Sequence, residues 1–268
     1  MNTLNFPKPE AWYTINQDIS YEELSRKLKS DEFVVGKVIF WNSSKNAFTV
    51  KLGNHIIGYM PIEEASIYPT IFPNGMLKPE AYNLIGKIIC TKIIKILPNA
   101  IILSRKKNML DTFKTINNFE NKIVNCYIKS AAGTMVFADI AHGISGLLHA
   151  KELSASMIKD VKDVGIKEKT FIEAKIKSIN YENFHINLGY KELYENLSDK
   201  YNPEDMLEVI SLYPVQNTED GYFAFVNPNT SAIINSYPNL VIPYGSKVIA
   251  KVRSSKTNKL KLSFVSFA

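Results

Sequence analysis

The feature that most constrains this chain is a strand-like pattern that occurs three times. The first copy opens with GKVIF at Gly36, the second with NKIVNCYIK at Asn121, and the third contains GYFAFV at Gly221. The copies recur after roughly 85 to 90 residues, which is much longer than the repeat unit of a solenoid. The sequence therefore predicts three small domains of one type, near the lower size limit at which a domain folds by itself.

Each copy alternates apolar and polar residues with a period of two, as half-buried strands do. In the first copy the apolar positions include Val38 and Phe40, then Val50 and Leu52. A longer proline-containing stretch, residues 62–84, separates the third and fourth strands. Five strands with one long connection are typical of an OB-type barrel. We expect a mostly β protein of three tandem five-stranded OB-fold barrels, the third degenerate, with short helical linkers.

The expected domain boundaries follow from these patterns. Ser20 followed by Glu23 forms a capping box and predicts a short N-terminal helix. In chain order we expect a lead-in at 1–32, a first barrel at 33–107, a linker at 108–118, a second barrel at 119–192, a linker at 193–206 and a third barrel at 207–268.

Positive charge is concentrated in the first and third copies. The whole chain has 32 Lys and Arg against 26 Asp and Glu, a formal charge of +6. Residues 33–107 contain ten basic and three acidic residues, residues 119–192 contain ten and nine, and residues 207–267 contain six and three. Attraction to a polyanion should therefore be strongest at the two ends of the array.

The remaining signals predict a soluble cytoplasmic protein without a metal or cofactor. Cys90 and Cys126 lie in apolar runs without zinc-site spacing, so we interpret them as core thiols in a reducing compartment. The first twenty residues lack a secretory pattern, and lysines interrupt the longest apolar stretch, 84–97. The histidines His55, His142 and His185 lack partners at metal-site spacing and are expected to be structural.

A set of short motifs in a fixed order carries a family resemblance. The first copy has GYMP at Gly58 and LS at Leu103; the second has VFADI at Val136 and GLLH at Gly146; the third has GYFAF at Gly221 and LS at Leu262. In this order and spacing they resemble the RNA-binding repeat of ribosomal protein S-one, an OB-fold of translation and RNA-decay proteins. The resemblance covers nearly everything after Phe33.

The resemblance implies where RNA contacts lie. In this family an aromatic residue on strand two and a histidine on strand three face RNA, and these positions carry over to Phe137 and His149 in the second copy, and to Phe223 and Asn235 in the third. Phe225, two residues beyond Phe223, should share the outer face.

The first copy departs from the family pattern at both of these positions. Thr49 replaces the aromatic residue and Pro61 replaces the histidine. Tyr59, two residues before Pro61 and on the same face, is the substitute that we predict. Candidate phosphate partners throughout the chain are basic residues near the expected faces: Lys37, Lys45, Lys51, Arg105, Lys151, Lys251, Arg253, Lys259 and Lys261.

Several of these positions have an ordinary structural interpretation as well. Aromatic residues in strands are usually buried, but Phe137 would face outward if Val136 and Ala138 fill the barrel interior. His149 could be a plain surface histidine. Of the neighbouring rings Phe40 and Trp41 either could be exposed, although core or interface positions are favoured.

The predicted function is non-catalytic binding of single-stranded RNA, with mRNA as the expected ligand, in translation or RNA metabolism. Bases would stack on exposed rings while lysines neutralise phosphates. No Gly-rich phosphate loop, HExxH motif or nucleophile elbow occurs in the sequence. The expected partners are single-stranded RNA and the small ribosomal subunit, with a monomeric protein and no membrane association. The alternative is a ribosome- or protein-docking module with little RNA binding of its own.

Overall fold

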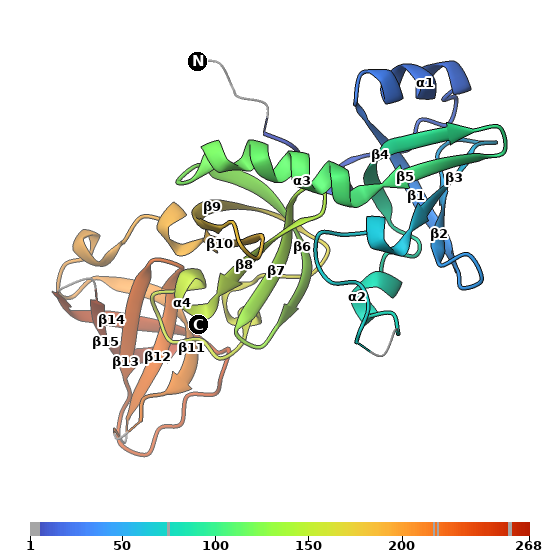
Figure 1. Cartoon of the computed structure of the whole chain (residues 1–268). Helices are drawn as coiled ribbons and strands as arrows, with labels where there is room; N and C mark the ends of the chain where they lie inside the picture. The colour runs from blue at the N-terminus through green and yellow to red at the C-terminus, as the bar shows by residue number, and fades with distance from the viewer. Residues whose placement is uncertain (1–5, 74–75, 217, 219, 257–258) are drawn as a thin grey trace.

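The computed structural model of the chain describes residues 6–73, 76–216, 218, 220–256 and 259–268. Within these residues the chain forms three closed five-stranded barrels (Figure 1). We number them barrel 1, barrel 2 and barrel 3 in chain order. The predicted mostly β fold of three tandem barrels is confirmed. The third barrel closes like the other two, so its divergence is a matter of sequence.

Barrel 1 has the strand order β1-β2-β3-β5-β4. β3 and β5 are parallel, and each of the other neighbouring pairs is antiparallel. Its strands are β1 (Phe33–Asn42), β2 (Ala47–Lys51), β3 (Ile57–Pro61), β4 (Ile88–Leu97) and β5 (Ala100–Ser104). The long connection between β3 and β4 contains the 3-10 turn η2 (Ile62–Glu64) and the short helix α2 (Pro79–Tyr82).

Barrels 2 and 3 repeat this connectivity. Barrel 2 consists of β6 (Ile123–Ala132), β7 (Met135–Ala141), β8 (Ile144–His149), β9 (Phe171–Asn180) and β10 (His185–Gly189). Barrel 3 consists of β11 (Met206–Pro214), β12 (Gly221–Asn227), β13 (Thr230–Asn235), β14 (Lys247–Lys256) and β15 (Lys259–Phe267). Each barrel closes through a parallel pair between its third and fifth strands.

The glycine that recurs in the third strand has a packing role at this closure. A Cβ on Gly58 would lie 2.6 Å from Leu103 Cδ1, and a Cβ on Gly146 would lie 2.5 Å from Leu188 Cδ1. The third strand therefore needs a very small residue where the closing leucine crosses it. Barrel 3 has Ala232 at this position, directly beside Leu260 on β15.

Short helices surround and connect the barrels. Helix α1 (Tyr21–Lys29) begins as predicted: the Ser20 hydroxyl accepts a 3.1 Å hydrogen bond from the backbone N–H of Glu23. The other helical segments are η1 (Glu10–Trp12), α3 (Arg105–Ile116), η3 (Asn117–Phe119), α4 (Ala150–Leu153), η4 (Val161–Val164), η5 (Lys191–Leu193) and η6 (Ser198–Lys200). No helix in the described part of the chain is long and apolar enough to cross a membrane.

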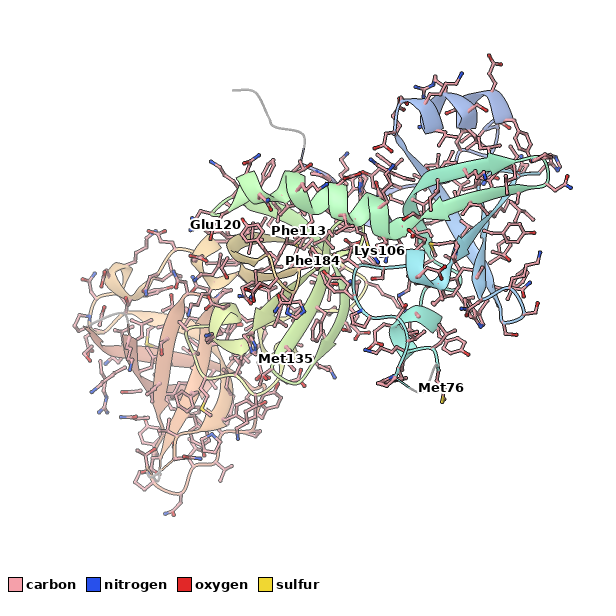
Figure 2. The ribbon with its side chains drawn as sticks, in the orientation of Figure 1. Met76, Lys106, Phe113, Glu120, Met135 and Phe184 are labelled. Atoms are coloured by element: carbon pink, nitrogen blue, oxygen red, sulfur yellow. The ribbon has the colours of Figure 1, made fainter. Side chains whose placement is uncertain are left out.

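Helix α3 joins barrel 1 to barrel 2. It starts directly after β5, and its far half buries Met109, Phe113 and Ile116 in the hydrophobic core of barrel 2. Phe113 lies beside Phe184, with ring centroids 5.1 Å apart (Figure 2). The helix thus covers most of the predicted linker 108–118 and packs it against barrel 2.

Candidate nucleic-acid interface

One row of side chains crosses three strands on the outside of barrel 1. Phe40 on β1 pairs with Thr49 on β2, which pairs with Tyr59 on β3. Phe40 is 47% exposed and Tyr59 is half-buried. Thr49 between them is buried, and its hydroxyl has no hydrogen-bond partner among the described residues. The ammonium group of Lys45 lies 4.7 Å from the centroid of the Tyr59 ring. The row thus contains two aromatic rings and a cation. They flank Thr49, which stands where the family pattern has an aromatic residue.

The exposure of Phe40 corrects the sequence analysis, which favoured a core or interface position for it. The register between β1 and β2 shifts between Val38 and Phe40, as at a β-bulge. A bulge inserts one residue and so reverses the side to which the following side chains point. Val38 remains buried, Phe40 turns outward, and Trp41 packs on Phe48 in the barrel core with centroids 4.8 Å apart.

Two predicted lysines lie next to this row. Lys37 on β1 pairs directly with Lys51 on β2, and Lys51 also pairs with Ile57, which is 46% exposed. Within the described residues, Lys37, Lys45 and Lys51 form no ion pair with a carboxylate. We call the set Lys37, Phe40, Lys45, Lys51, Ile57 and Tyr59 the barrel 1 face. It combines aromatic rings with cations that form no ion pair in the described part of the chain, and these are the components of a single-strand binding surface.

Arg105 was predicted as a phosphate partner, and the structure contradicts this. It is the first residue of α3, and its guanidinium is buried. Its Nε and Nη2 donate hydrogen bonds of 2.7 and 2.8 Å to the Glu10 carboxylate, and Nη1 donates one of 3.2 Å to the Ala65 carbonyl. The side chain points into the junction between barrels 1 and 2, so it cannot reach a strand of RNA on the outer face.

That junction is a buried polar cluster. The Asp139 carboxylate on β7 accepts hydrogen bonds from the backbone N–H groups of Glu10 at 2.8 Å and Gly143 at 2.9 Å. Burial and the nearby Glu10 carboxylate raise the pKa of Asp139 to about 6. A Cβ on Gly143 would lie 1.9 Å from Arg105 Nη2, and its φ is +87°, so both space and backbone geometry require glycine there.

His142 occupies the same junction and has a structural role, as predicted. Its Nδ1 lies 2.9 Å from Thr112 Oγ1 and its Nε2 lies 2.9 Å from the Tyr13 hydroxyl. Burial lowers the pKa of this imidazole to about 4. The residue therefore links helix α3 and the N-terminal segment to barrel 2 in its neutral form.

Barrel 2 exposes the predicted aromatic side chain. Phe137 on β7 is 43% exposed because its neighbours Val136 and Ala138 fill the barrel interior with no exposed surface. The outward orientation derived from the alternation is confirmed. His149 is exposed at the end of β8, opposite Met135 on β7, and is followed closely by the exposed Lys151. Their contact with RNA stays a prediction.

The β3–β4 connection of barrel 1 touches barrel 2 beside this surface. The Tyr68 hydroxyl donates a 3.1 Å hydrogen bond to the Phe184 carbonyl and accepts one of 3.1 Å from the backbone N–H of Ser145. The Tyr68 ring also lies 6.3 Å from the ring of His185. Barrels 1 and 2 are thus joined by α3, by the polar junction and by this loop, and present their faces as parts of one body.

In barrel 3 the predicted aromatic residues are partly covered by barrel 2. Phe223 and Phe225 point away from their own barrel, as predicted, but both are only half-exposed and pack against the core of barrel 2. Ser156 of barrel 2 fixes this junction, since its hydroxyl donates a 2.7 Å hydrogen bond to the Ala224 carbonyl. Leu212 on β11 is buried in the same cluster. Barrel 2 thus covers part of both rings, and their contact with RNA stays a prediction.

The polar residues predicted for barrel 3 lie on β13, β14 and β15. Asn235 is exposed and pairs with Ser263, to which Arg253 donates a hydrogen bond. Lys259 and Lys261 are exposed on β15 and pair with no carboxylate in the described part of the chain, whereas Lys251 forms an ion pair with Glu204. Barrel 3 thus keeps a strip of positive charge without a freely exposed ring from the predicted set.

Two features were not predicted from the sequence: the ion pair of Glu10 with Arg105, and the contact of Tyr68 with barrel 2. For Phe40 the sequence left exposure open but favoured a core or interface position. The pair Phe40-Trp41 was the one available signal, because two adjacent rings in a strand cannot both point inward. Among the described residues, no group of three or more His, Cys, Asp or Glu side chains is placed to hold a metal ion.

Together these observations define an array of three OB-type barrels with an aromatic and basic face on the first. Comparison with known proteins shows which proteins the chain is related to. The chain is a distant relative of small ribosomal subunit protein bS1 over most of its length: 25% identical over 230 residues to the protein of Staphylococcus saprophyticus and 27% identical over 201 residues to that of Staphylococcus haemolyticus. These alignments cover 81% and 70% of this chain and 54% and 48% of the relatives. The chain thus spans about half the length of these relatives.

The solved structures that it resembles are more remote. One is a multidomain protein with nucleic acid binding domains from Streptococcus pneumoniae, which is 13% identical. The match covers 87% of this chain and 73% of that protein, with a TM-score of 0.26. Another is GSP13 from Bacillus subtilis, which is 15% identical. This match covers 32% of this chain and 61% of GSP13, also with a TM-score of 0.26. No protein-family model matches the chain.

Proposed function

We propose that this protein binds single-stranded RNA without catalysing a reaction, and that the barrel 1 face is its main contact surface. The observation that carries the proposal is the row from Phe40 to Tyr59, flanked by lysines that form no ion pair with a described carboxylate. Exposed rings stack with the faces of unpaired bases, and each stacked base contributes roughly 1 to 3 kcal/mol. A duplex hides those faces, so the surface should prefer single strands.

Barrel 2 extends this surface. Phe137 supplies a third exposed ring, and His149 and Lys151 lie at the end of the neighbouring strand. Because barrels 1 and 2 are held together by several buried contacts, one strand of RNA can engage both without first ordering the domains. Pre-organisation of this kind lowers the entropic cost of binding.

The relationship to bS1 supports a setting in translation, with mRNA as the ligand and the small ribosomal subunit as a possible neighbour. We further propose that the protein acts as a cytoplasmic monomer and that its RNA preference is broad, because stacking tolerates every base.

The direct test is fluorescence anisotropy with a labelled single-stranded RNA and its duplex form, titrated with intact protein at two salt concentrations. The proposal predicts tighter binding of the single strand and a weaker affinity at the higher salt, since cations on the protein release counter-ions from the phosphates. Equal binding of both forms, or no binding, would contradict it.

A second candidate function is docking to the ribosome or to another protein. The observation that favours it is the exposure of apolar side chains on barrel 3: Tyr237, Val241 and Phe267 are 60%, 73% and 48% exposed. An intact protein that binds no RNA but sediments with small ribosomal subunits would favour docking. Loss of that sedimentation after Val241→Asp would locate the contact.

A further inference from the structure

A hollow of about 720 Å³ lies on barrel 1, between the N-terminal segment 13–17 and strands β1, β2 and β4. Lys37 and Lys51 line it together with the apolar side chains of Ile15, Ile39 and Ile88. Its volume falls within the range of roughly 300 to 1,000 Å³ that is typical of small-molecule sites. The hollow therefore has the size of a ligand site and combines positive charge with apolar walls.

The two lysines are an unusual pair. Lys37 and Lys51 lie directly opposite each other on antiparallel strands, where side chains with like charges destabilise a sheet. Neither forms an ion pair with a carboxylate among the described residues. None of the described residues that line the hollow is acidic. An anion held between the two ammonium groups would relieve their repulsion.

The walls of the hollow are fixed at both ends. At one end the Gln17 carbonyl accepts a 3.0 Å hydrogen bond from the backbone N–H of Asn54. At the other end the Tyr13 hydroxyl lies 2.9 Å from His142 Nε2 of barrel 2. The N-terminal segment is thus anchored on both barrels, and the hollow exists before a ligand arrives.

The hollow continues the barrel 1 face. Lys51 follows Thr49, the centre of the aromatic row, by two residues on β2. At the usual rise of about 3.4 Å per residue, the lysine pair lies about 7 Å from that row. A single strand whose bases stack on Phe40 or Tyr59 can therefore extend into the hollow.

We propose that this hollow is a subsite for one nucleotide of the bound strand, with its phosphate between Lys37 and Lys51 and its base or ribose against the isoleucine wall. This rests on the proposed RNA binding and assigns a position to a nucleotide beyond the stacking row. The ligand class is a nucleoside monophosphate unit, free or within a strand.

The test is backbone amide NMR of the intact protein with uridine, with uridine 5′-monophosphate and with a single-stranded oligouridylate. The expected result is a set of shifts at Ile15, Lys37 and Gly86 with the monophosphate and the oligonucleotide but not with uridine. The double variant Lys37→Ala/Lys51→Ala should lose these shifts and lower the slope of log affinity against log salt by about 0.7 for the strand. Lys29→Ala, which removes an exposed lysine on helix α1 outside the hollow, should change neither.

The outcomes separate this proposal from the one on which it depends. If the oligonucleotide shifts Phe40 and Tyr59 but leaves Ile15, Lys37 and Gly86 unchanged, the nucleotide subsite is wrong while RNA binding stands. If the oligonucleotide shifts neither group, the proposed function fails as well. If uridine alone shifts the lining residues as strongly as its monophosphate, the assignment of the lysine pair to a phosphate is wrong.

Discussion

Barrels 1 and 3 have the same connectivity, yet their outer aromatic residues lie in different surroundings. In barrel 1, Phe40 is open to solvent and Tyr59 carries a lysine over its ring. In barrel 3, Phe223 and Phe225 pack on the core of barrel 2. A period-two pattern determines which side chains point outward from a barrel. It does not determine whether such a side chain meets solvent or a neighbouring domain.

The two barrels also differ in where their lysines lie relative to exposed rings. The lysines of barrel 1 lie beside exposed rings, so stacking and phosphate contact can occur on one strand of RNA. Lys259 and Lys261 of barrel 3 are exposed on β15, while the predicted rings of that barrel are covered. We therefore assign stacking to barrels 1 and 2 and a purely electrostatic contribution to barrel 3.

The largest expected effect concerns the one predicted phosphate partner of barrel 1 that is buried. Arg105→Ala leaves the Glu10 carboxylate in the junction without its partner, which costs about 3 to 5 kcal/mol of folding free energy. Urea unfolding measures this loss. Lys51→Ala is the matched control on the open face and should change stability by less than about 0.5 kcal/mol. A mild effect at Arg105 would mean that the junction does not hold the barrels together.

The second prediction uses the titration of the same junction. The pKa of His142 is lowered to about 4, so the folded state prefers the neutral imidazole. The stability that this group contributes is complete above about pH 6.5 and is lost as the pH falls toward 4, by roughly 3 kcal/mol in total. Because asparagine tolerates the positive φ of 45° at this position, His142→Asn is the suitable variant.

His142→Asn should be less stable than wild type at pH 7, and the gap in unfolding free energy should narrow between pH 6.5 and pH 4. Asp139, whose raised pKa acts in the opposite direction, titrates in both proteins and largely cancels in the difference. A gap that stays constant over this range would show that His142 is not held neutral in the junction.

The third prediction compares one ring from each barrel. Phe40→Ala should weaken single-stranded RNA binding by about 1 to 3 kcal/mol and leave stability nearly unchanged, because the ring is exposed. Phe223→Ala should do the reverse: RNA affinity stays the same, while the loss of packing on barrel 2 destabilises the fold by about 1 to 3 kcal/mol. Anisotropy and thermal unfolding of both variants distinguish these cases, and equal losses of affinity would remove the contrast between the barrels.

The smallest expected effect concerns Lys45, whose ammonium lies over the Tyr59 ring. Lys45→Ala should reduce the slope of log affinity against log salt by about 0.7, the amount for one phosphate on a single strand. Lys122→Ala, an exposed lysine at the start of barrel 2 and away from the barrel 1 face, should leave the slope unchanged. Matching slopes for the two variants would argue against a phosphate at Lys45.

Much of the fold follows from local sequence. Alternation and the proline-containing connection predict five strands per barrel, and Val136 and Ala138 correctly place Phe137 outside. The orientation of Phe40 could not be predicted in the same way, because a single extra residue in β1 reverses the alternation beyond Val38. The backbone hydrogen bonds that create this bulge depend on β2. The adjacent rings of Phe40 and Trp41 indicate that one of them faces outward, but not which one.

The residues of the candidate site are harder to predict, because contacts between residues far apart in the chain decide which side chains are exposed. Arg105 is basic and follows β5, as a phosphate partner should, but Glu10 lies 95 positions earlier in the chain and neutralises it. Phe223 matches the family position, but Ser156 and the surrounding surface of barrel 2 cover it. Both outcomes depend on how domains pack, which a repeated pattern within each domain does not encode.

We propose that RNA runs over the open faces of barrels 1 and 2 and avoids the partly covered rings of barrel 3. Ultraviolet crosslinking of unmodified protein to a single-stranded oligouridylate, followed by mass spectrometry of the peptides, tests this without any substitution. We expect crosslinks at Phe40, Tyr59 and Phe137. Crosslinks concentrated at Phe223 and Phe225, with none on barrel 1, would contradict it.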